Sequence, residues 1–151
     1  MQCKRRFWFL AYPDINKAVG GIKQIHRVAE IIERLGFFSC LVQEHASFRP
    51  NWFESNVKTI SRSDWYERTD YDPQIDIIVL PETFVPLVPS IFPGIPKIIF
   101  NQNASYTFGL PSKTVYKPSA ITAIYHHQDV LQVWCVSRSD YNFLVCGLDL
   151  S

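Results

Sequence analysis

The chain has 151 residues, enough for one domain that buries a core without disulfides or a metal. Hydrophobic residues make up 47% and charged residues 19%, a composition that excludes an intrinsically disordered chain. The net charge of +1 gives no electrostatic basis for binding nucleic acid or an anionic membrane.

The first half of the chain contains one strong helix pattern between two apolar runs. Six apolar residues fall at helical spacing on one face: Ile22, Ile25, Val28, Ala29, Ile32 and Leu35. His26 lies on the polar side of that pattern and is expected to face solvent. We predict a strand at Arg6–Pro13, a helix at Gly21–Gly36, a strand at Phe37–Gln43 and a short edge strand near Val57–Ile60.

The second half contains three more apolar runs, each of strand length. They predict buried strands at Ile75–Glu82, Pro96–Asn103 and Val130–Ser137. Ser137 precedes a final helix and has Asp140 three residues later, an arrangement typical of a capped N-terminus. Unbroken apolar strands that alternate with helices indicate an α/β protein, a Rossmann-like parallel sheet with helices on both faces.

A glycine pair, Gly20 and Gly21, stands between the first predicted strand and the first helix. Such a pair either lets a phosphate approach the backbone at the helix N-terminus or forms a plain turn with positive φ. A dinucleotide site is disfavoured because G-x-G-x-x-G is missing, and the G-K-[ST] ending of a P-loop is missing too.

Polar residues follow two of the other predicted strands. Ligands bind at the carboxyl ends of strands in open parallel sheets, which makes Glu82, Asn101, Gln102 and Asn103 candidate site residues. Glu82 could accept hydrogen bonds from a sugar hydroxyl or act as a base, or it could cap the first turn of the next helix. The three amides suit a hydroxyl-rich ligand, or they satisfy the backbone of the loop.

No residue of the chain has the sequence context of a catalytic nucleophile, so the catalytic residues stay unknown. The four cysteines form no C-x-x-C pair, no metal site is predicted, and two of them lie in apolar runs. The N-terminal apolar run is too short for a signal peptide. We therefore expect a cytoplasmic protein with reduced cysteines.

Four segments, in this order, resemble the N-terminal domain of GT-B glycosyltransferases of the bacterial group 1, family 4-like type. The segments are "GGIKQIHRVAEIIERLGFFSCLV", "DIIVLPE", "PGIPKIIFNQNASYTF" and "VWCVSRSDYNFL". The resemblance implies one Rossmann-like domain over residues 1–151, the acceptor-side half of a two-domain enzyme. It also implies that Gly20 and Gly21 contact the phosphates of a nucleotide-sugar donor, and that Glu82 and Gln102–Asn103 line the acceptor side, where we expect Asn101 to bind as well.

The donor domain of that family has no counterpart in this sequence. The chain alone is therefore expected to bind no cofactor and to transfer no sugar, and to need a C-terminal domain or partner chain. Its expected ligand is a sugar or glycan acceptor. The alternative is a stand-alone carbohydrate- or protein-binding module without enzymatic activity. Under either hypothesis, the aromatic-rich chain could expose an apolar patch and self-associate.

Overall fold

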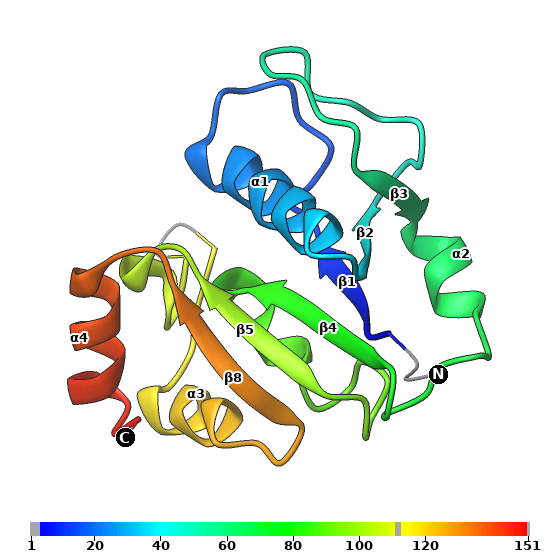
Figure 1. Cartoon of the computed structure of the whole chain (residues 1–151). Coiled ribbons are helices and arrows are strands. Elements are labelled where there is room, and N and C mark those ends of the chain that lie inside the picture. The colour runs from blue at the N-terminus through cyan, green and yellow to red at the C-terminus, as the bar shows by residue number, and fades with distance from the viewer. Residues whose placement is uncertain (1–3, 111–112, 151) are drawn as a thin grey trace. The chain divides into compact units, whose positions relative to one another are not determined.

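The computed structural model describes residues 4–110 and 113–150. It is an α/β fold with a six-stranded parallel sheet in the order β3-β2-β1-β4-β5-β8, flanked by helices (Figure 1). Counted along the chain within this sheet, the order is 3-2-1-4-5-6, that of doubly wound nucleotide-binding folds. The predicted fold class is confirmed. The chain divides into two compact units within β4, one up to Val79 and one from Leu80 onward, and each is described separately.

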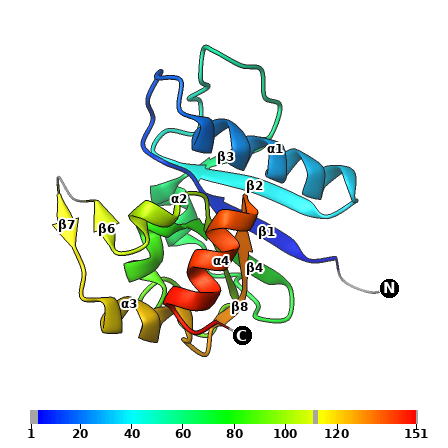
Figure 2. The same cartoon turned by 90° about the vertical axis from the view of Figure 1, so that its left-hand side faces the viewer.

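The first unit is built on a run of parallel strands whose buried residues form its core. Its elements are β1 (Arg6–Leu10), α1 (Gly20–Arg34), β2 (Phe38–Gln43), β3 (Lys58–Ser61), α2 (Arg62–Glu67) and the start of β4 (Asp76–Pro81). β1 pairs with β2 on one side and with β4 on the other. Helices α1 and α2 lie on opposite sides of these strands (Figures 1 and 2), as right-handed crossovers in opposite directions require.

Helix α1 follows the predicted apolar stripe, with Ile22, Ile25 and Ala29 buried. The chain leaves the helix through Gly36 at φ +87°, a conformation that favours glycine. Helix α2 was not predicted. It is six residues long, and its N-terminus is capped by the Ser61 hydroxyl, which accepts a hydrogen bond from the Asp64 N–H.

His26 is buried, with 3% of its surface exposed, so the expectation of a solvated side chain is wrong. Its Nδ1 lies 2.7 Å from the Ser55 Oγ, and its ring meets the Phe53 ring edge to face. Both partners come from the long segment that follows β2. The pKa of His26 is lowered to about 4, mainly by burial and also by the Arg49 charge, and the Glu30 carboxylate partly opposes this shift.

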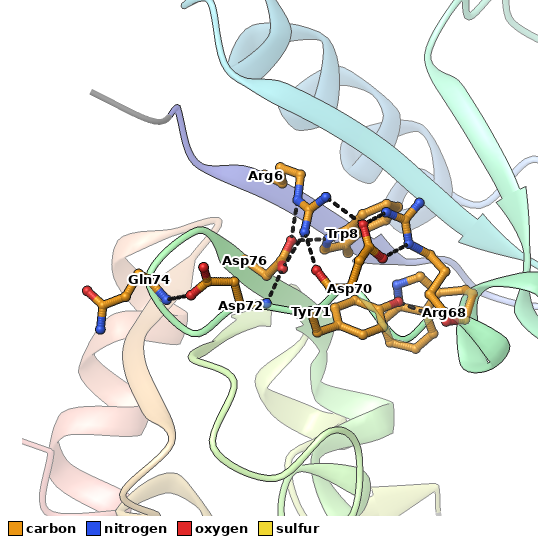
Figure 3. Close-up of polar contacts among 9 residues, drawn as sticks. Arg6, Trp8, Arg68, Asp70, Tyr71, Asp72, Gln74 and Asp76 are labelled. Carbon is orange, nitrogen blue, oxygen red and sulfur yellow. Dashed lines mark hydrogen bonds and ion pairs between the residues drawn. The ribbon is translucent and has the colours of Figure 1, made fainter. Parts of the chain in front are cut away.

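A buried carboxylate organises the amino ends of β1 and β4 (Figure 3). Asp76 is fully buried and accepts hydrogen bonds from the Arg6 Nε and Nη2, the Trp8 Nε1 and the Asp72 N–H, at 2.7–2.8 Å. The guanidinium of Arg68 lies over the Trp8 ring, 4.6 Å from its centroid. Four donors around one carboxylate satisfy a charge that would otherwise be costly to bury.

The second unit contains the end of β4 and the remaining elements. These are the 3-10 helix η1 (Glu82–Leu87), β5 (Lys97–Asn101), the 3-10 helix η2 (Ala104–Tyr106), β6 (Gly109–Leu110), β7 (Thr114–Val115), α3 (Pro118–Tyr125), β8 (Val130–Cys135) and α4 (Arg138–Gly147). β5 and β8 are parallel partners, whereas β6 and β7 form a separate antiparallel hairpin ahead of α3 (Figure 2). Ser137 caps α4 as predicted, since its Oγ accepts a hydrogen bond from the Asp140 N–H.

Lys97, at the start of β5, is fully buried. Its Nζ lies 3.1 Å from the Asp129 Oδ2 and donates to the Phe92 carbonyl, while Asp129 also accepts from the Gly94 N–H at 2.9 Å. Burial lowers the pKa of Lys97, and the Asp129 carboxylate opposes that effect. This pair ties the loop before β5 to the turn before β8.

Strand β8 was predicted to be buried, and this is wrong for much of its length. Leu131 is 54% exposed, because β8 is the last strand in the sheet order. Cys135 is accordingly only half-buried, whereas Cys40 in β2 is buried as expected. Among the described helices, none has the length and apolar character that crossing a membrane demands.

Candidate ligand-binding site

A cavity of about 180 Å³ opens in the second unit, next to the carboxyl end of β4. It is enclosed by η1, by the end of η2 and by the β6–β7 hairpin. Its lining residues are Glu82, Thr83, Pro86, Tyr106, Thr107, Gly109, Leu110, Lys113, Thr114 and Tyr116. Carboxyl ends of parallel strands are where ligands bind in this fold class, so the position agrees with a functional site.

Glu82 is the first residue after β4 and is 2% exposed. Its Oε2 accepts a hydrogen bond from the Gln102 N–H at 3.0 Å, which links the ends of β4 and β5. The pKa of the nearby Tyr125 phenol is raised mainly by burial, and the Glu82 charge raises it further. The cavity therefore has a buried acidic residue in its wall, held in place by backbone.

Two threonines add hydroxyl groups to the same wall. Thr107 is 1% exposed, and its Oγ1 accepts a hydrogen bond from the Asn101 Nδ2 at 3.0 Å. The Oγ1 of Thr83 is buried and has no hydrogen-bond partner among the residues that the structure describes. A buried hydroxyl without a partner carries a desolvation cost that a ligand's hydroxyl group could remove.

Aromatic and basic residues also line the cavity. Tyr106 and Tyr116 bring two rings to the lining, and Lys113 lies between β6 and β7. Gly109 opens the hairpin at φ +106°, and a Cβ there would lie 2.0 Å from the Thr114 carbonyl oxygen. Only glycine therefore allows the two short strands to come this close.

Of the four residues expected on the acceptor side, Glu82 alone lines the cavity. The side chain of Asn101 is buried behind it, where its Nδ2 donates to the Thr107 Oγ1 and the Tyr125 hydroxyl. Gln102 supplies the backbone N–H that binds Glu82. Asn103 caps η2 through a hydrogen bond from the Ser105 N–H, which fits the loop-satisfying alternative.

The sequence did not predict that Thr83 and Thr107 line the cavity. It also did not predict the cavity residues of the β6–β7 hairpin. Thr83 directly follows Glu82 at the strand end, so its position was a signal that could have identified it. Lys113 and Tyr116 lie beside strands of two residues, which are too short to show any alternation.

Gly20 and Gly21 are the first two residues of α1. Neither has a positive φ, so the alternative of a left-handed turn is wrong. The N-cap residue Val19 makes no side-chain cap, and the first turn holds no acidic residue. A Cβ added to Gly20 would meet no atom within 4 Å. The glycine pair thus leaves an uncapped, open helix N-terminus, and a phosphate contact there stays a prediction.

Three potential metal ligands, Asp14, Glu44 and His45, come together after β1 and β2 with ligand atoms within 4.8 Å of one another. Asp14 already accepts hydrogen bonds from the backbone N–H groups of Glu44 and His45, at 3.2 and 2.9 Å. The His45 ring nitrogen lies 3.0 Å from the same carboxylate. These contacts show that the cluster connects the chain after β1 to the chain after β2 through hydrogen bonds.

Comparisons of the chain with protein-family models, with curated proteins and with solved structures found no match.

Proposed function

We propose that this chain is the acceptor-binding part of a nucleotide-sugar-dependent glycosyltransferase, and that it holds a sugar acceptor in the cavity beside Glu82. The observation that carries the proposal is that one cavity is lined both by buried Glu82 and by Thr83, whose buried hydroxyl has no partner in the described part of the chain. The 3-2-1-4-5-6 strand order and the resemblance of four segments to GT-B glycosyltransferases support it.

The cavity has the chemistry that a sugar ring requires. Carboxylate and hydroxyl oxygens accept hydrogen bonds from sugar hydroxyls, and the Thr83 hydroxyl also donates one. The rings of Tyr106 and Tyr116 offer apolar surface to the C–H groups of a sugar while their hydroxyls stay available for hydrogen bonds. The residues in this arrangement orient an acceptor, and a donor would be bound by a further domain or chain.

The test is a titration of the isolated chain with glucose, mannose and N-acetylglucosamine, followed by amide chemical shifts in NMR spectra. We expect shifts that concentrate at Glu82–Thr83 and on the β6–β7 hairpin. Thr83→Val is the decisive variant, because it removes a buried hydroxyl without a partner and should leave the free energy of unfolding unchanged or slightly raised. The same variant should lower sugar affinity several-fold.

Glu82→Gln should also weaken binding, and the exposed Glu54→Gln is the matched control that should not. Calorimetry with a UDP-sugar should show no binding to this chain, since the proposal assigns donor binding to a further domain or chain. Sugar shifts that avoid the cavity, or a Thr83→Val variant with full affinity, would contradict the proposal. Tight binding of the nucleotide sugar would contradict the assignment to the acceptor side.

A further inference from the structure

Lys113 is a charged residue of the cavity wall that the proposed function leaves without a role. Its N–H donates a hydrogen bond to the Leu110 carbonyl at 2.8 Å. Its side chain is exposed, and no carboxylate in the described part of the chain forms an ion pair with its ammonium group. The cation therefore borders the cavity without a counter-charge.

The other charged residue of the lining is Glu82, and the two do not pair. Glu82 is buried and held by the Gln102 N–H, whereas Lys113 is at the solvent-exposed hairpin. The cavity thus presents a hydrogen-bond acceptor in its buried wall and a separate positive charge at its opening. A ligand that matches both has hydroxyl groups at one end and an anionic group at the other.

The described residues of the hairpin on both sides of its turn make close backbone contacts. The contact between Gly109 and Thr114 closes it, and the Tyr116 N–H donates to the Phe108 carbonyl at 2.8 Å. Leu110 and Thr114 line the cavity together with Lys113, which keeps the ammonium group within reach of a bound ligand.

We infer that the ligand of this cavity is an acidic sugar, bearing a carboxylate or a phosphate, and that Lys113 binds the anionic group. The inference rests on the proposed function, since it takes the sugar hydroxyls to bind beside Glu82 and Thr83. An ammonium–anion hydrogen bond is stronger than a neutral one, so Lys113 selects acidic over neutral sugars.

The experiment compares three probes with the same chain by calorimetry: glucose, glucuronate and glucose 6-phosphate. We expect at least one acidic sugar to bind about tenfold more tightly than glucose, the gain of one charge-assisted hydrogen bond. The carboxylate and phosphate probes distinguish the two sources of negative charge. Raising the salt concentration should reduce this preference, because the lysine is exposed.

Lys113→Gln should abolish the preference and leave glucose binding unchanged. Lys117→Ala is the matched control, an exposed lysine four residues away that does not line the cavity, and should keep the preference. Equal affinities for all three probes in the wild-type chain would overturn the inference and leave the proposed function standing. Failure of every probe to bind would contradict the proposed function itself.

Discussion

Arg6 and Asp76 form a two-pronged ion pair between β1 and β4, with the Arg6 Nε and Nη2 donating to separate oxygens of the carboxylate at 2.7 and 2.8 Å (Figure 3). Arg6 also reaches Asp70, whose side chain is 57% exposed. The two acidic partners of one guanidinium therefore differ in burial, which makes their contributions to stability separable.

Asp76→Asn should lower the free energy of unfolding by about 3 kcal/mol, because it removes the buried one of the two carboxylates that pair with Arg6 and disturbs the Trp8 and Asp72 hydrogen bonds. Asp70→Asn is the matched control and should change stability little. Urea unfolding of both variants measures the difference. Equal losses would show that burial of Asp76 does not determine the strength of this network.

His26 should make the chain less stable in mild acid. Its pKa of about 4 in the folded state lies below the ordinary value of 6.5, so the unfolded chain binds the proton more strongly. The stabilisation is complete above pH 6.5, decreases as the pH falls towards 4, and amounts to at most about 3 kcal/mol. The free energies of unfolding of the wild type and of His26→Gln should therefore approach each other as the pH is lowered over this range.

An NMR titration provides the direct measurement, in which the His26 ring signals should stay unshifted down to about pH 5. A His26 midpoint near 6.5 would mean that the Ser55 and Phe53 contacts do not exclude water from the ring.

Removing Asp129 should lower the free energy of unfolding more than removing Lys97. Asp129→Asn leaves a fully buried ammonium group with only the Phe92 carbonyl, whereas Lys97→Met removes the buried cation and keeps most of its volume. In the second variant Asp129 still accepts the Gly94 N–H. Asp129→Asn should cost about 3–5 kcal/mol in unfolding free energy and Lys97→Met clearly less. Similar losses in urea unfolding would contradict this account.

The elements that sequence predicted well are those whose own residues carry the signal. Helix α1 has a continuous apolar stripe, and the strands near Arg6, Phe38, Asp76 and Lys97 are apolar runs, so local pattern was sufficient. Helix α2 was missed because six residues show no helical period. Its one local signal was Ser61 followed three residues later by Asp64.

Errors arose where a distant segment decides the environment of a residue. His26 is on the polar side of α1 by periodicity, yet a segment some thirty residues later covers it. Strand β8 is apolar, yet its place at the sheet edge leaves Leu131 exposed. The candidate site shows the same limit, since Glu82 could be predicted from a strand end, whereas Tyr106 and Lys113 depend on a hairpin without sequence periodicity.

Alanine substitutions at Gly109 and Gly94 test whether the hairpin shapes the cavity, since both glycines have positive φ but different surroundings. A Cβ at Gly94 (φ +88°) meets no atom within 4 Å, so Gly94→Ala adds only backbone strain of about 1–2 kcal/mol. A Cβ at Gly109 would lie 2.0 Å from the Thr114 carbonyl oxygen and 3.1 Å from the Tyr116 ring. Gly109→Ala must therefore open the hairpin and move Tyr116.

The measurement is NMR of both variants, with and without the sugar that binds the wild type most tightly. Gly109→Ala should shift the amide signals from Phe108 to Tyr116 and weaken sugar binding at least tenfold, because two cavity walls separate. Gly94→Ala should lose stability and retain sugar affinity, since it lines no part of the cavity. Full affinity in Gly109→Ala would show that the hairpin contributes nothing to binding and would leave Glu82 and Thr83 as the whole site.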